Sequence, residues 1–284
     1  MSEMSPEPAT RRARLVVAYD GGAFHGFAAN EGVATVAGTL GDALDTVLRE
    51  PVGLTGAGRT DAGVHAWGQV VSLDLPVETD LHQLARRLNA LCAPQVVVRE
   101  AAWAPTDFNA RFSATWRHYR YTVLNDPVPD PFLARVAWQI PAPLSLRNLR
   151  LACDPLIGQH DFSSFCRRPK QPEGAPAASL VRRVLAADWS IEHAWNDRPV
   201  LRFEIRATAF CHQMVRSIVG TLVDVGLGRL HAGDVRSILL ARDRARAGQV
   251  APPHGLCLWE VGYDAADLRG VEVAEELLNE GADG

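Results

Sequence analysis

The sequence predicts an α+β protein built from two ferredoxin-like or RNP-like antiparallel-sheet units. In the first half, strand-like and helix-like periodicities follow one another in the order β-α-β-β-α-β, which is typical of such a unit. In the second half, segments of period-two alternation return and are interrupted by segments of helical spacing. We therefore expect two related units side by side, with a positively charged cleft between them.

The first half contains the clearer pattern. Apolar residues at helical spacing predict helices over residues 39–49 and 81–91, and Thr39 with Asp42 suggests the start of the first helix. Alternating apolar residues predict strands over residues 14–19, 69–75 and 96–102. An antiparallel sheet with both helices on one face follows from this order.

The second half is expected to contain four strands and three helices. The strands cover residues 117–124, 181–191, 200–208 and 255–263, and the helices cover 145–157, 212–225 and 234–241. The strand at 117–124 places Tyr119 and Tyr121 on one face, where two tyrosines are either core residues or a surface on which bases stack. Residues 166–179 are rich in Pro, Gly and Ala and begin with Arg167, Arg168 and Lys170, so they form either a solvated insertion or a basic flap.

These elements suggest two domains between two tails. We expect a disordered tail over residues 1–13, an N-terminal α+β domain over 14–110, a C-terminal α+β domain over 111–264 and an acidic tail over 265–284. The first residues lack the apolar core of a signal peptide, and no apolar run reaches membrane-spanning length. The sequence therefore predicts a cytoplasmic protein without a membrane segment.

Charge and cysteine usage restrict the function classes. The net charge is −4, so an RNA ligand would require a local basic surface. The five cysteines are widely spread and contain no Cys-x-x-Cys pair, which argues against a disulfide framework and against a zinc knuckle. No cofactor fingerprint or metal-ligand cluster is evident, so we expect neither a cofactor nor a metal.

The string GAGRTDAGVHA at residues 56–66 is the main candidate for a functional loop. Its glycines permit tight turns, and the next strand follows directly. Asp61 could be a turn former, a metal ligand together with His65, or a lone catalytic carboxylate with Arg59 placed to meet a phosphate. A phosphate cradle is disfavoured, because the string has neither a P-loop ending nor a dinucleotide fingerprint.

Five ordered motifs resemble those of the tRNA pseudouridine synthase A family, over about residues 14–263. They are YDG at 19–21 with Phe24 and Gly26, GRTDAGVHA at 58–66, FNARFSA and RHYRY at 108–121, HDFSSF at 160–165, and FCHQMVRSIVG at 210–220. The family has Trp-Gln where this chain has Phe27-Ala28, and Gln where it has Ala37. These departures concern RNA contacts of the first domain and leave the catalytic loop intact.

The resemblance implies the pseudouridine synthase fold and an RNA-modifying isomerase. Members convert uridine to pseudouridine at tRNA positions 38, 39 and 40 in the anticodon stem-loop. They act as homodimers that grip the tRNA. On the residues matched here, Asp61 would be the catalytic acid. Tyr119 would support the target base, Arg59 would hold a phosphate or fill the space of the flipped nucleotide, and Arg216 would pair with Asp61. An adjacent cation favours the ionised form of a carboxylate. His65 is expected to be structural.

Two rival functions use the same residues. The first is a metal-dependent phosphoesterase with ligands from Asp61, His65, His160, Asp161 and His212, whose scattered spacing counts against it. The second is a non-catalytic RNA-binding protein on the same scaffold, which has no need for an acid beside phosphates.

Overall fold

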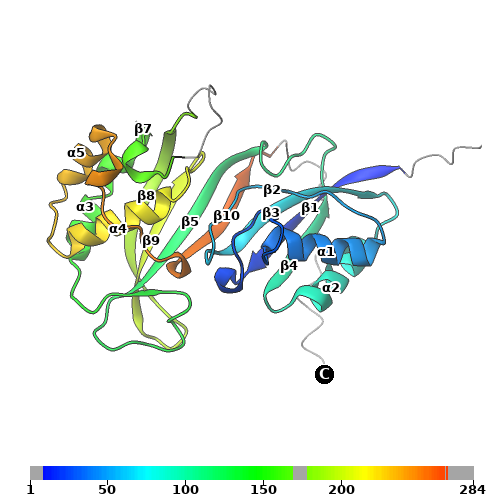
Figure 1. The fold of residues 1–284 in the computed structure, drawn as a ribbon, viewed down its shortest axis with the longest axis horizontal. Helices are drawn as coiled ribbons and strands as arrows, with labels where there is room; N and C mark the ends of the chain where they lie inside the picture. Colours follow the sequence, from blue (N-terminus) through cyan, green and yellow to red (C-terminus); the bar gives the residue numbers. More distant parts are fainter. Residues whose placement is uncertain (1–8, 169–177, 266, 268–284) are drawn as a thin grey trace, which may run out of the picture. The chain divides into compact units, whose positions relative to one another are not determined.

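The computed structural model describes residues 9–168, 178–265 and 267, and it confirms the α+β class (Figure 1). By its internal contacts the chain divides into two compact units. Unit 1 comprises Met1–Thr60, Ala66–Thr115 and Val261–Gly284, and unit 2 comprises Asp61–His65 and Trp116–Glu260. The arrangement of two units side by side and the positively charged cleft stay predictions.

Unit 1 has the β-α-β-β-α-β order expected for the first half, although only three of its four strands were assigned a range from the sequence. Its elements are β1 (Thr10–Tyr19), α1 (Val36–Leu48), β2 (Thr55–Gly56), β3 (His65–Pro76), α2 (Leu81–Cys92) and β4 (Val96–Trp103), with a single 3₁₀ turn at Gly21–Ala23. The strands lie in the order β4-β1-β3-β2, and every pair is antiparallel. This is the strand order of a ferredoxin-like unit, and α1 packs against α2 (Figure 1).

Three predicted boundaries in unit 1 are wrong, among them the start of β3, which lies at His65 and not at residue 69. Strand β1 begins at Thr10, so residues 10–13 belong to the sheet and not to a disordered tail; Ala13 is fully buried between Leu73 and Trp103 on the flanking strands. Helix α1 begins at Val36 and not at residue 39, because the Thr35 hydroxyl accepts a hydrogen bond from the Gly38 N–H at 3.2 Å and caps the first turn. Residues 1–8 and 268–284 of the predicted tails lie outside the described residues.

Unit 2 contains the remaining elements. They are β5 (Ala114–Leu124), β6 (Trp138–Gln139), α3 (Leu146–Leu151), β7 (Gly158–Asp161), β8 (Val181–His193), β9 (Pro199–Ala207), α4 (Met214–Gly226), α5 (Asp234–Ala241) and β10 (Leu256–Tyr263), the last divided between the units at residue 260. Single 3₁₀ turns lie at Asp154–Leu156, Ser163–Phe165, Arg244–Arg246 and Pro253–Gly255. The predicted helix over 145–157 ends at Leu151, and Pro155 cannot continue a helix because it lacks an N–H.

The sheet of unit 2 follows the order β5-β9-β8-β7 and has one apolar and one polar face. The register pairs Tyr119 with Ile205 and Tyr121 with Phe203, and their buried side chains form the apolar face together with Trp189. The alternate residues form the polar face, where Arg120 is paired with Glu204 at 2.6 Å. Strands of period two with one buried face produce this division.

The predicted domain limits differ from the compact units in two places. The Asp61–His65 segment makes its contacts with unit 2, although we expected it in the N-terminal domain. Residues 111–115 group with unit 1. The centre of the expected basic flap, residues 169–177 with Lys170, lies outside the described residues.

Candidate active site

The loop that carries Asp61 is a tight turn with an obligatory glycine. The Val64 N–H donates a hydrogen bond to the Asp61 carbonyl at 3.1 Å, and Gly63 adopts φ +77°. A Cβ atom on Gly63 would lie 2.9 Å from Cγ of Pro253, so both the backbone conformation and the close approach require glycine. The turn therefore holds the Asp61 side chain at a defined position against the segment around Pro253.

The residues just before Asp61 are anchored in unit 1. The Gln69 side-chain amide donates to the Gly58 carbonyl at 2.9 Å, and the Tyr19 and Thr60 hydroxyls lie 2.8 Å apart. The Phe27 N–H donates to the Thr60 carbonyl at 3.1 Å, and the Phe27 ring occupies the space that a side chain on residue 56 would need. Phe27, one of the departures from the family pattern, thus supports this loop by packing.

The Asp61 carboxylate meets a different basic side chain at each oxygen. Nη1 of Arg216 lies 3.1 Å from Oδ2 of Asp61, and Nε2 of His212 lies 3.4 Å from Oδ1. The Asp61 side chain is 24% exposed, Arg216 is 14% exposed and His212 is 45% exposed. The carboxylate is thus charge-paired and still open to a ligand.

Helix α4 holds Arg216 rigidly. Nε of Arg216 donates a hydrogen bond to the Ala251 carbonyl at 2.8 Å, and the Ala251 N–H donates one to the Arg216 carbonyl at 3.0 Å. Gly220, one turn further on, has no side chain where the carbonyl of Gln249 lies against the helix. The guanidinium therefore bridges the backbone and the carboxylate through two of its nitrogens, which a lysine cannot do.

Tyr119 and Tyr121 on β5 have different surroundings. The Tyr121 hydroxyl donates to the Pro252 carbonyl at 2.8 Å, so this side chain ties the sheet to the segment before β10. The Tyr119 ring packs edge-on against Phe210, with centroids 5.0 Å apart. Burial, followed by the negative charge of Asp61, raises the pKa of the Tyr119 phenol. The charge of Asp61 thus acts on the Tyr119 phenol, whereas the Tyr121 hydroxyl stabilises the contact between β5 and the segment before β10.

Two further histidines surround the turn. Nε2 of His65 lies 3.0 Å from the Arg135 carbonyl and 3.1 Å from the His254 carbonyl, so its ring joins two other segments of unit 2. Burial lowers the pKa of His254, and the nearby charge of Arg216 acts in the same direction. His65 accordingly bonds the backbone of these two segments, where the sequence suggested that of its own loop.

The structure brings three of the four predicted site residues together. Asp61, Arg216 and Tyr119 lie in unit 2, whereas Arg59 belongs to unit 1. The Arg59 side chain is exposed, and within the described part of the chain it makes no hydrogen bond or ion pair. Sequence reasoning missed His212 as a partner of Asp61. His212 lies before α4, which begins at Met214, so helical spacing does not place it beside Arg216 and no signal in the sequence identified it as a partner.

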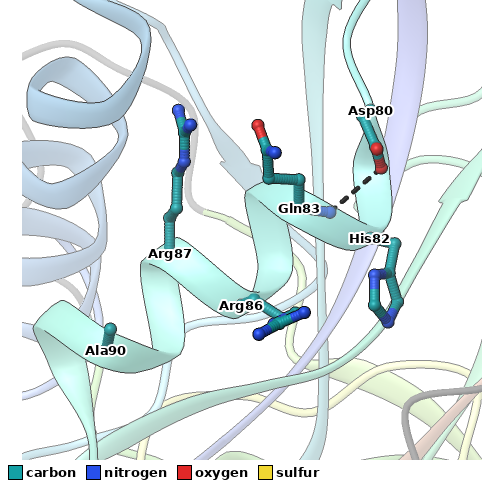
Figure 2. A pocket seen from close by; sticks show the side chains of 6 residues that line it. All are labelled: Asp80, His82, Gln83, Arg86, Arg87 and Ala90. Atoms are coloured by element: carbon teal, nitrogen blue, oxygen red, sulfur yellow. Dashed lines mark hydrogen bonds between the residues drawn. The ribbon is translucent and has the colours of Figure 1, made fainter.

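A second group of polar residues lies on α2 in unit 1. Its hollow of about 490 Å³ is lined by Asp80, His82, Gln83, Arg86, Arg87 and Ala90. Figure 2 shows that His82 and Arg86 extend to one side of the helix and Gln83 and Arg87 to the other. The Asp80 carboxylate accepts a hydrogen bond from the Gln83 N–H at 3.0 Å, so it caps the helix. This group has the residue types of a functional site, but its side chains extend from a helix surface and its aspartate caps that helix.

Two features are absent from the described residues. Over residues 9–168, 178–265 and 267, no three His, Cys, Asp or Glu side chains are grouped to hold a metal ion. In the same part of the chain, no helix combines the length and the apolar character needed to cross a membrane.

Known proteins match nearly the whole chain. A family model described as tRNA pseudouridine synthase matches residues 152–264. Proteins named tRNA pseudouridine synthase A from Bacillus subtilis and Cereibacter sphaeroides are 36% and 41% identical over 255 residues, which is 89% of this chain and 99% and 98% of theirs. The protein of that name from Leifsonia xyli subsp. xyli is 41% identical over 89% of this chain and 91% of its own.

Proposed function

The chain belongs to the tRNA pseudouridine synthase A family, and from this membership we propose that it isomerises uridine to pseudouridine in tRNA. The targets are the uridines at positions 38, 39 and 40 of the anticodon stem-loop, as the motifs of this chain suggest. In this reaction the N1–C1′ glycosidic bond breaks, C1′ forms a bond to C5, the C5 proton leaves and N1 gains a proton. The formula of the nucleotide does not change, so no co-substrate is required.

The observation that carries this proposal is the carboxylate of Asp61, which is partly exposed and paired with Arg216 at 3.1 Å. Asp61 acts as the nucleophile or as the base, and either role requires the ionised carboxylate. Arg216 favours that form by charge and by a charge-assisted hydrogen bond. Because Nε of Arg216 is bound to the Ala251 carbonyl, the guanidinium stays in place when substrate enters.

The target uridine has to leave its base stack to reach Asp61, because the ribose and the ring edge are inaccessible inside a stem. We assign Tyr119 to support the extruded base, and Arg59 to contact a phosphate or to fill the vacated position. Tyr119 is supported by its place beside Asp61 and Phe210. Arg59 is supported by its exposed guanidinium, two residues before the catalytic acid.

The test is pseudouridine mapping on unmodified tRNA, incubated with the wild-type chain and with Asp61→Asn. We expect conversion at positions 38 to 40 by the wild type alone. Conversion at other uridines would overturn the proposed target, and equal conversion by Asp61→Asn would overturn the assignment of the acid. Binding of tRNA without conversion by the wild type would favour the non-catalytic RNA-binding alternative.

Two further properties belong to the proposal: the chain acts as a homodimer, and it works in the cytoplasm. The first comes from the resemblance in sequence, and the second is the expectation drawn above from the sequence itself. Light scattering measures the first directly, because a dimer has twice the 30.9 kDa mass of the chain. A mass of one chain, alone and with tRNA, would remove the dimer from the proposal. Fractionation of cells that express the tagged full chain tests the second, and recovery with the membranes would contradict it.

A further inference from the structure

Three polar side chains are buried in unit 1 beside the segment that leads to Asp61. Gln69 on β3 is fully buried, Tyr19 at the end of β1 is 5% exposed, and Thr60 is 7% exposed. The Gln69 amide donates hydrogen bonds to the Gly58 carbonyl at 2.9 Å and to the Tyr19 hydroxyl at 3.5 Å. The Tyr19 and Thr60 hydroxyls share a hydrogen bond of 2.8 Å. The three side chains therefore form one connected network.

The hydrogen bonds of this network run toward the residue directly before Asp61. Because the Gln69 amide nitrogen can only donate, the Tyr19 hydroxyl accepts from it and keeps its own proton for Oγ1 of Thr60. The remaining polar atom of the amide, Oε1 of Gln69, accepts a hydrogen bond from the Val70 N–H at 3.2 Å. All polar atoms of the Gln69 side chain are thus bonded.

The location of the network indicates what it holds. Buried amides and hydroxyls cost free energy that their hydrogen bonds only offset, and apolar side chains could fill the same space. Residues 58–60 belong to no helix or strand, so no helix or sheet ladder fixes them. The bonds to the Gly58 carbonyl and to the Thr60 hydroxyl constrain this segment up to the residue before the acid.

We propose that Gln69, Tyr19 and Thr60 are positioning residues, which act through residues 58–60 to hold the Asp61 carboxylate in place for the reaction. A misplacement of ~1 Å in an active site costs up to ~10²-fold in rate, so loss of the network lowers kcat. Since the three side chains are buried, they act on the acid and not on bound tRNA, and KM stays nearly constant. This inference rests on the proposed function.

Two substitutions of Thr60 test the role of its hydroxyl. Thr60→Val keeps the shape of the side chain and removes the hydroxyl, whereas Thr60→Ser keeps the hydroxyl. We expect Thr60→Val to lower kcat about tenfold with less than about a twofold change in KM, and Thr60→Ser to restore most of the wild-type kcat. Tyr19→Phe, which removes the other hydroxyl, should resemble Thr60→Val. An equal loss of kcat in both Thr60 variants, or a loss confined to KM, would overturn the proposal.

A second buried amide in unit 1 provides the control for stability. The Asn89 side chain on α2 donates a hydrogen bond to the Val98 carbonyl at 3.0 Å and accepts one from the Val98 N–H at 2.7 Å. Asn89→Ala loses both bonds, so we expect its urea midpoint to fall at least as far as that of Thr60→Val, with kcat unchanged. If kcat falls equally in Asn89→Ala, the effect is general destabilisation and the proposal is wrong.

Amide hydrogen exchange tests the network without tRNA. The Phe27 N–H, which donates to the Thr60 carbonyl at 3.1 Å, reports on the position of the segment. We expect it to exchange faster in Thr60→Val and as in the wild type in Thr60→Ser and Asn89→Ala. Unchanged exchange in Thr60→Val would contradict the proposal. If no form of the chain modifies tRNA, the proposed function fails, and the exchange rates still decide whether the network holds the segment.

Discussion

Unit 1 and unit 2 each contain an aspartate, a histidine and an arginine near a helix, and only one of the two groups has the geometry of an active site. In unit 2, Asp61 is contacted by His212 and Arg216. In unit 1, Asp80, His82 and Arg86 border the hollow on α2 (Figure 2). The residue types are the same, and the partners of the carboxylate differ.

The difference shows what converts side chains into a site. Asp80 uses its carboxylate to cap its own helix, through a bond to a residue three positions away. Asp61 pairs with an arginine 155 residues away, and the bond of that arginine to Ala251 fixes its position. A carboxylate held by distant, partly buried partners is preorganised for chemistry, whereas the Asp80 carboxylate is bonded to an N–H of its own helix.

We expect the largest difference in the rate of pseudouridine formation between substitutions of the two aspartates, Asp61 and Asp80. Asp61→Asn removes the charge and should lower the rate of pseudouridine formation by ~10³-fold or more, as loss of an essential group does. Asp80→Ala should leave the rate unchanged and reduce the free energy of unfolding by ~1 kcal/mol, the cost of a lost cap. Single-turnover rates and urea unfolding measure the two effects. An equal loss of rate in both variants would show that the comparison is wrong.

We expect the second-largest difference in rate between substitutions of the two arginines, Arg216 and Arg86. Arg216→Lys keeps the charge but cannot serve Asp61 and the Ala251 carbonyl together, so the rate should fall by ~10²-fold. Arg86→Lys on α2 is the matched control, for which we expect no change in rate. Retention of the wild-type rate by Arg216→Lys would mean that charge alone, without the two-nitrogen geometry, is sufficient.

The two histidines should differ by a smaller factor. His212→Ala removes the contact with Oδ1 of Asp61, a bond worth ~1 kcal/mol, so the rate should fall by about fivefold. His82→Ala should have no effect on it. The decisive measurement is kcat/KM for both variants under identical salt. A fall confined to KM would show that His212 contributes to tRNA binding and not to the position of the carboxylate.

The smallest effect concerns pH and stability. Since burial lowers the pKa of His254, the unfolded chain binds its proton at a higher pH than the folded chain. The stabilisation is present above the unfolded pKa of about 6.5 and is lost as pH falls toward the folded value. His254→Gln should therefore reduce the loss of stability between about pH 7 and pH 5. Urea midpoints at the two pH values decide this, and identical slopes for the wild type and His254→Gln would contradict it.

Sequence reasoning identified most elements because their signals are local. The periodicity of residues 81–91 predicts α2 to within one residue, and Leu84, Ala85 and Leu88 are buried as expected. The start of α1 was wrong because Thr35 and Thr39 are both plausible caps, and only the hydrogen bond to Gly38 distinguishes them. Strands β2, β6 and β7 were missed because two to four residues are too few to show a period.

The sequence by itself determined the α+β class and the family, and it singled out Asp61 as the proposed acid, because these depend on local periodicity and on contiguous motifs. It pointed to Arg216 and Tyr119 through resemblance, and contact between segments brought them to Asp61. Only the tertiary structure decided that His212 meets the other carboxylate oxygen and that the Asp61 turn packs with unit 2. The physical reason is that such contacts depend on how distant segments pack, and no periodicity within one segment encodes its distant partner.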